Sequence, residues 1–234
     1  MSVAPPWRPN QLRGGLVQLD QTPPTVVNVI TFQYNPDTVT RTLTPRAIGG
    51  EPGDRLEVLR LTGPPKETIK LEAEFDLDDN YPEFVATPYL VNTPAYQGSL
   101  DPVTQSVGLL TTLAALESLI TPSTTQLANV DALFMAGQIE VAPVEAPLTL
   151  LVWGPKRIVP VLLTSLTVTE EAFGPQLQPI RAKVSLELKT LTSSDFPAGS
   201  PGEQRYLAYR KYSETWAAAA TTTNTSPMGI EHIT

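Results

Sequence analysis

Acidic side chains come nearest to forming a chemical site in this sequence. Asp76, Asp78 and Asn80 occupy the first, third and fifth positions of a calcium-binding loop pattern. The sixth position is Tyr81, where the sharp turn of such a loop needs glycine, and the twelfth is Thr87, where a bidentate glutamate is needed. The pattern therefore indicates the acidic end of a strand, and we predict no metal site.

The usual groups for acyl transfer, sugar hydrolysis and nucleotide binding are missing or badly placed. The single histidine, His232, lies near the end of the sequence, and no Gly-x-Ser-x-Gly turn occurs. Glu170 and Glu171 are adjacent, so on a strand they would point to opposite faces and not flank one glycosidic bond. No glycine-rich phosphate loop occurs. We therefore predict a protein that is not an enzyme and uses no cofactor.

The composition favours one large β-rich domain. The 234 residues include 24 prolines and 14 glycines, which interrupt helices and favour strands joined by turns. Cysteine is absent, which excludes disulfides and fits a reducing cytoplasm. No secretory leader and no apolar run long enough to cross a bilayer is present. We expect a soluble protein that is located in the cytoplasm.

Charge is distributed unevenly along the chain. The net charge is -8, which argues against a nucleic-acid surface. No basic residue lies between Lys70 and Lys156, whereas that segment holds eleven acidic residues. Two interpretations stay open: a solvated surface, or oppositely charged patches that meet when subunits stack. The acidic residues that we take as interface candidates are Glu72, Glu74, Asp76, Asp78 and Asp79.

Alternating hydrophobicity predicts five strands, at residues 26–34, 68–77, 147–153, 158–169 and 180–189. In 68–77 the apolar residues alternate with Lys70 and three acidic residues, which is typical of a half-buried strand with an acidic outer face. Residues 180–189 repeat the pattern with mostly basic outer residues. The proline-rich residues 1–25 are expected to form an irregular N-terminal arm, and the long loops around 36–66 and 78–104 are candidates for subunit contacts.

Only two segments have helical periodicity. Residues 105–120 place Leu109, Leu113, Leu116 and Ile120 on one face. Residues 203–220 form the second helix, and its Tyr206, Tyr209 and Trp216 are further interface candidates. The predicted organisation is an arm at 1–25, a β domain at 26–196 and a helical tail at 197–234.

Three short motifs, taken in order and with their spacing, resemble the tube and baseplate adaptor proteins of contractile injection systems, which are phage-tail-like particles of bacteria. The positions are Phe32, Tyr34, Asn35 and Pro36, then Trp153 and Gly154, then Phe173, Pro179, Arg181 and Ala182. The segment Gly108 to Glu117 is similar to the Gly-x-x-x-x-Leu-x-x-Leu-Glu helix of that family. The resemblance covers about residues 26–196.

This resemblance implies a mainly β (α+β) fold of the tail-tube type, an antiparallel β-sandwich or partly closed barrel with a flanking helix. It also implies a six-membered homo-oligomeric ring that joins the inner tube to the baseplate hub and spike, with tube, spike and wedge proteins as partners and no nucleic acid or membrane insertion. Many such adaptors end in a peptidoglycan-binding LysM module, for which residues 197–234 are too few, so we expect the helix at 203–220 to be the docking element. The alternatives are the inner-tube subunit itself and a carbohydrate- or peptidoglycan-binding β-sandwich.

Overall fold

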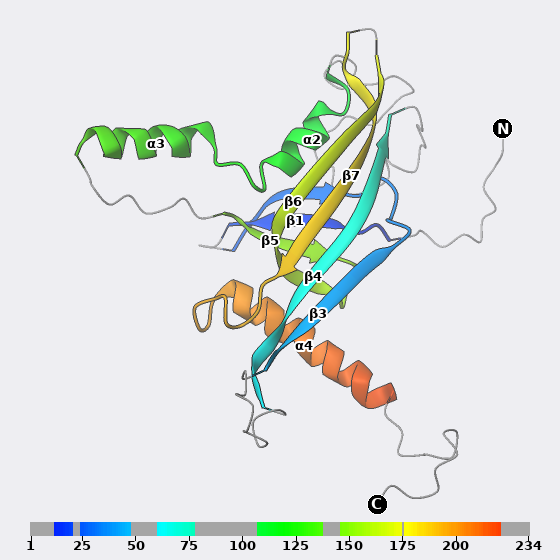
Figure 1. Ribbon diagram of the computed structural model, residues 1–234, viewed down its shortest axis with the longest axis vertical. Helices are drawn as coiled ribbons and strands as arrows, with labels where there is room; N and C mark the ends of the chain where they lie inside the picture. Colours follow the sequence, from blue (N-terminus) through cyan, green and yellow to red (C-terminus); the bar gives the residue numbers. More distant parts are fainter. Residues whose placement is uncertain are drawn as a thin grey trace, which may run out of the picture.

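The computed structural model describes residues 12–20, 24–47, 60–77, 107–137, 146–174 and 176–220. Seven strands form one antiparallel sheet in the order β2-β1-β5-β6-β7-β4-β3 (Figure 1). The strands are β1 (Gly15–Leu19), β2 (Val26–Thr31), β3 (Val39–Ala47), β4 (Leu61–Asp76), β5 (Leu148–Val152), β6 (Ile158–Phe173) and β7 (Pro179–Thr190), and the helices are α2 (Leu110–Glu117), α3 (Thr124–Met135) and α4 (Pro201–Ala220). The predicted mainly β class with added helices is confirmed.

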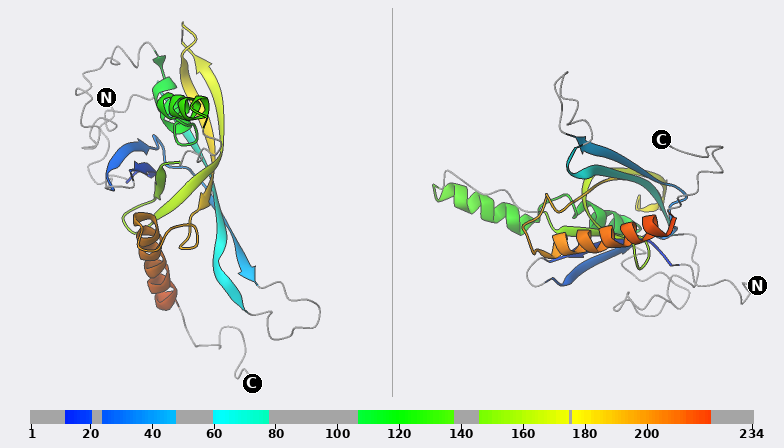
Figure 2. Two further views of the ribbon diagram at one scale, coloured as in Figure 1. Left: turned by 90° about the vertical axis from the view of Figure 1, so that its left-hand side faces the viewer. Right: turned by 90° about the horizontal axis from the view of Figure 1, so that it is seen from below.

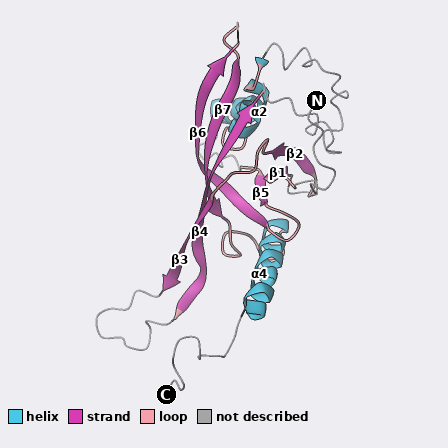
Figure 3. Cartoon of the chain, turned by 90° about the vertical axis from the view of Figure 1, so that its right-hand side faces the viewer, coloured by secondary structure: helices cyan, strands magenta, loops and turns pink. Residues whose placement is uncertain are grey.

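The sheet folds over its own inner face. Leu16 of β1 and Ile30 of β2 belong to the same buried cluster as Leu71 of β4 and Val184 of β7, although those strands lie far apart in the sheet order. Figures 2 and 3 show the short strands β1, β2 and β5, with α2 and α4, all on one side of the long strands β3, β4, β6 and β7. The apolar sides of the alternating strands therefore face one shared core, and their charged sides face outward.

Helix α2 covers one end of this core with leucine side chains. Leu109, Leu113, Leu116 and Leu119 are buried, as the spacing of three and four residues predicts. The predicted helix was too long, because α2 ends at Glu117 and Ile120 is exposed. Gly108 precedes the helix with φ +59, and a β-carbon there would collide with the carbonyl oxygen of Pro179.

Helix α4 confirms the predicted C-terminal helix and starts two residues earlier than expected. The turn that leads from β7 to α4 is held by Asp195, whose carboxylate accepts hydrogen bonds from the backbone N of Thr192 (2.9 Å), from its Oγ1 (2.8 Å) and from Lys189 Nζ (3.2 Å). Burial alone would raise the pKa of Asp195, but these hydrogen bonds and the charge of Lys189 lower it.

Two strands and one helix were missed. The predicted irregular arm is wrong at Gly15–Leu19, which forms β1 and pairs with both β2 and β5. The predicted loop at 36–66 is wrong in part, because it contains β3 and the first residues of β4. Both missed strands lack a clear alternation: β1 is short, and β3 is an edge strand rich in threonine. Helix α3 has no buried residue, and Figure 1 shows it projecting from the body of the protein.

Candidate functional site

The first motif, Phe32 to Pro36, and the second, Trp153 and Gly154, lie together in the core and in the turns beside it. Phe32 is fully buried, and its ring lies 6.3 Å from that of Trp153. The Asn35 side chain accepts a hydrogen bond from Gly14 N and donates one to Leu12 O, both at 2.8 Å. Gly154 has φ +90 in the turn between β5 and β6. These contacts fix the chain around β1 and β5, and Pro36 beside them is half-buried whereas Tyr34 is exposed.

The first and last motifs meet through Asp76, at the end of β4. Gln33, inside the first motif, accepts a hydrogen bond from Asp76 N (2.8 Å) and donates one to Asp76 O (2.5 Å). The carboxylate of Asp76 is paired with Arg181 at 2.6 Å. A hollow of about 250 Å³ opens here, and it is lined by Tyr34, Glu74, Phe75, Asp76, Glu171, Arg181 and Lys183. The role of Gln33 was not predicted, because a single glutamine carries no sequence signal.

The remaining third-motif positions also support the fold. Ala182 is fully buried in β7, and Pro179 is buried at the start of that strand. The Pro179 carbonyl oxygen accepts a hydrogen bond from Leu109 N at 2.8 Å, which ties the β6–β7 hairpin to the beginning of α2. Phe173, which is paired with Pro179 across the hairpin, is half exposed. The motif residues thus hold strands and helices in place.

The acidic face of β4 is paired within the same sheet. Lys183 of β7 lies 3.6 Å from Glu74 of β4 and 3.0 Å from Glu171 of β6, and Glu187 of β7 lies 3.1 Å from Lys70 of β4. The Glu171 hydrogen bond is the largest contribution that raises the pKa of Lys183. Glu72 is exposed opposite Ser185. Asp78 and Asp79, like His232 and the predicted loop at 78–104, lie outside the described residues.

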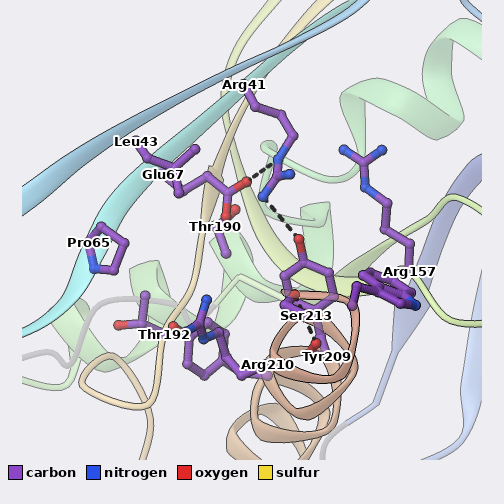
Figure 4. A pocket seen from close by; sticks show the side chains of 12 residues that line it. Arg41, Leu43, Pro65, Glu67, Arg157, Thr190, Thr192, Tyr209, Arg210 and Ser213 are labelled. Atoms are coloured by element: carbon purple, nitrogen blue, oxygen red, sulfur yellow. Dashed lines mark hydrogen bonds and ion pairs between the residues drawn. The ribbon is translucent and has the colours of Figure 1, made fainter. Parts of the chain in front are cut away.

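The larger cavity is a cleft of about 330 Å³ between α4 and the inner face of the sheet, and we call it the α4 cleft (Figure 4). Its lining is Arg41, Leu43, Pro65, Glu67, Arg157, Thr190, Thr192, Tyr206, Tyr209, Arg210, Ser213 and Trp216. The side chains come from β3, β4 and β7, from the β5–β6 turn and from one face of α4. No single sequence motif contains them, so only the fold brings them together.

A buried ion pair lies in the middle of the α4 cleft. Arg41 Nε is 2.5 Å from Glu67 Oε1, and Arg41 Nη2 donates a hydrogen bond to the Tyr209 hydroxyl at 3.0 Å, as Figure 4 shows. Burial would lower the pKa of Arg41, but the hydrogen bond to Glu67 and the negative charge of Glu67 raise it. Burial raises the pKa of Tyr206. Thr190 is 1% exposed, and its buried hydroxyl has no hydrogen-bond partner within the described part of the chain.

The aromatic residues of α4 divide between core and surface. Tyr206 and Tyr209 are buried against the sheet, so in the single chain they stabilise the docking of α4 and offer little area to a partner. Trp216 is 44% exposed and stacks on Tyr212 with ring centroids 6.3 Å apart. Of the three predicted interface residues in α4, Trp216 alone presents a large surface.

No protein-family model matches this chain, and no curated protein does. Among the described residues, no group of three or more histidine, cysteine or acidic side chains is arranged to hold a metal ion. None of the described helices is long and apolar enough to cross a membrane.

Proposed function

We propose that this chain is a non-enzymatic structural subunit of a bacterial contractile injection system, an adaptor ring that joins the inner tube to the baseplate hub and spike. The motifs that resemble this family support the proposal, because their residues are structural in the fold. Phe32 packs on Trp153, and Gln33 and Arg181 both bind Asp76. A building block needs such fixed strand positions, whereas a catalyst needs a reactive group in a cavity.

The observation that carries the proposal is the apolar edge strand β2. Among the described residues β2 pairs only with β1, and Val26, Val27 and Val29 are 62%, 60% and 40% exposed. The strand has neither charge nor proline, and although its register with β1 shifts between Asn28 and Val26, the residues from Asn28 to Thr31 pair regularly. Edge strands of monomeric proteins are usually protected by charge, proline or bulges, because free backbone groups pair with other chains. This edge is therefore suited to pairing with another subunit.

The opposite edge of the sheet is the candidate partner. Within the described residues β3 pairs only with β4, and although the end of β3 contains Pro45, Arg46 and two register shifts, its first residues, from Val39 to Thr44, pair with β4 regularly. If β2 of one copy pairs with β3 of the next, the contact is head-to-tail, and a closed ring results when the rotation between copies completes a circle. In such a ring, backbone hydrogen bonds run from subunit to subunit and carry load when the sheath contracts.

The direct test is to purify particles from cells with and without this chain, image them by negative staining and count its copies. An adaptor is expected at about six copies per particle, as one closed ring contains. Copy numbers many times higher would identify the inner-tube subunit instead. Complete particles that never contain the chain would refute both assignments.

A second test addresses the edge itself. We expect a Val27→Lys, Val29→Lys double variant to fold but to fail to restore particle assembly, because lysine on an edge strand blocks pairing. The matched control is Thr167→Lys, at an exposed position in β6 in the middle of the sheet. Full assembly by the β2 variant would contradict edge pairing.

A truncation that removes residues 203–234 would not test docking by the helix cleanly, because Tyr209 of α4 belongs to the main core and binds Arg41. Trp216→Ala is the better test, since Trp216 is exposed and stacks only on Tyr212 among the aromatic residues described. If α4 docks on a neighbour, this variant keeps its stability and loses incorporation into particles. Normal incorporation would argue against that role.

A further inference from the structure

The α4 cleft is positively charged on a negatively charged protein. Its lining contains three arginines, Arg41, Arg157 and Arg210, and one acidic residue, Glu67. The chain as a whole has a net charge of -8. Because a cleft with low-dielectric walls concentrates the field of its charges, this excess of positive charge attracts anionic groups specifically to the cleft.

Two of the three arginines are available for a ligand. Arg41 already forms an ion pair with Glu67 and donates a hydrogen bond to the Tyr209 hydroxyl. Arg157 forms no ion pair within the described part of the chain, and Figure 4 shows it across Tyr209 from Glu67. Arg210 has one distant partner, Glu214 at 3.8 Å, and both side chains are largely exposed, so that pair is weak. A carboxylate is the side-chain group that matches these arginines, because it accepts charge-assisted hydrogen bonds from guanidinium groups.

We propose that the α4 cleft binds an acidic peptide, a segment of a partner protein whose carboxylates pair with Arg157 and with Arg210. The apolar part of the lining supports a peptide over a free anion, because Leu43, Pro65 and the exposed Trp216 provide contacts for a neighbouring apolar side chain. A volume of about 330 Å³ holds a few side chains. The net charge of -8 makes a nucleic-acid backbone an unfavourable ligand.

The test uses the purified full chain and two fluorescein-labelled peptides, one of alternating glutamate and phenylalanine and one with glutamine in place of glutamate. Fluorescence anisotropy at about 0.15 M ionic strength, where exposed charges are screened beyond about 8 Å, is expected to show binding of the glutamate peptide and not of the glutamine peptide. The Arg157→Gln, Arg210→Gln double variant is expected to weaken binding at least about tenfold, because two charge-assisted hydrogen bonds are lost.

The matched control is the Lys156→Gln, Arg205→Gln double variant, which removes the same charge from exposed neighbours that do not line the cleft. It is expected to bind within about twofold of the original protein, as distant exposed charges are screened. Thermal melting of both double variants establishes that they are folded.

Several results would overturn the proposal. Equal weakening by both double variants would mean general charge attraction and no defined site. Failure of the original protein to prefer the glutamate peptide would exclude an acidic peptide ligand. Displacement of the peptide by inorganic phosphate at similar concentrations would identify a site for small anions. None of these results depends on whether the chain belongs to an injection particle.

Discussion

Replacing Arg41 by methionine tests whether the buried ion pair holds the α4 cleft together. The Glu67 side chain is 8% exposed and that of Arg41 is 35% exposed, so Arg41→Met leaves a buried carboxylate without its partner. Removing one member of a buried pair costs about 3–5 kcal/mol of unfolding free energy. Since water reaches part of Arg41, we expect about 2–3 kcal/mol, at or below the low end of that range.

The companion variant separates loss of the pair from loss of packing. In the double variant Arg41→Met, Glu67→Leu, no unpaired charge remains. The unfolding free energy of this double variant is therefore expected to lie within about 1 kcal/mol of that of the original protein, or above it. Urea unfolding followed by circular dichroism measures each free energy by linear extrapolation. The reasoning fails if Arg41→Met unfolds at the same urea concentration as the original protein. It also fails if the double variant is less stable than Arg41→Met.

Three further predictions concern the fold and are tested by unfolding measurements. Phe32→Ala is expected to lose about 3–5 kcal/mol, because a fully buried ring on Trp153 becomes a cavity; a smaller loss than for the exposed Phe173→Ala would contradict the structural role of the motif. Gly108→Ala should lower the melting temperature more than Gly137→Ala, since both have positive φ but only the first meets Pro179; equal effects would exclude the clash. The lowered pKa of Asp195 stabilises the fold above its ordinary value of 3.8, and this gain disappears as the pH falls through the folded-state pKa. Asp195→Asn should therefore be destabilised at neutral pH and approach the original protein below pH 3.8, and a difference that does not depend on pH would refute the assignment.

Strands with one buried apolar face and one solvent-exposed polar face could be predicted from the sequence. Strands without this difference between their two faces could not. In β4 and β7 the alternation of apolar and charged residues follows from burial on one side and water on the other, so both strands were found. In β3, Arg41 and Glu67 of the neighbouring strand lie on the inner face as an ion pair, which breaks the apolar pattern. The buried Glu67 carboxylate is paired with Arg41, and a residue distant in sequence, Tyr209 of α4, accepts a further hydrogen bond from Arg41. A local sequence window contains no information about such a partner.

The candidate site was harder to predict than the fold for a related reason. The residues within each motif lie close together in sequence, and the resemblance implied that they are structural. The lining of the α4 cleft comes from segments as far apart as Arg41 and Trp216. Each arginine taken alone is an ordinary surface residue, and only the topology brings three of them into the lining of one cleft. The net charge of the chain is -8, and this value does not indicate a local positive site.

The pairing of β4 with β7 changes where subunit contacts are expected. From the sequence, an acidic segment and a mildly basic remainder suggested that opposite patches meet between stacked subunits. In the fold, Glu74 pairs with Lys183 and Asp76 with Arg181, so the two strands neutralise one another within a single chain. The outer face of the sheet therefore has no need of an oppositely charged neighbour. Free backbone groups remain at the edge strand β2, and excess positive charge remains in the α4 cleft. We infer that backbone pairing at β2 drives assembly and that the cleft selects an acidic partner.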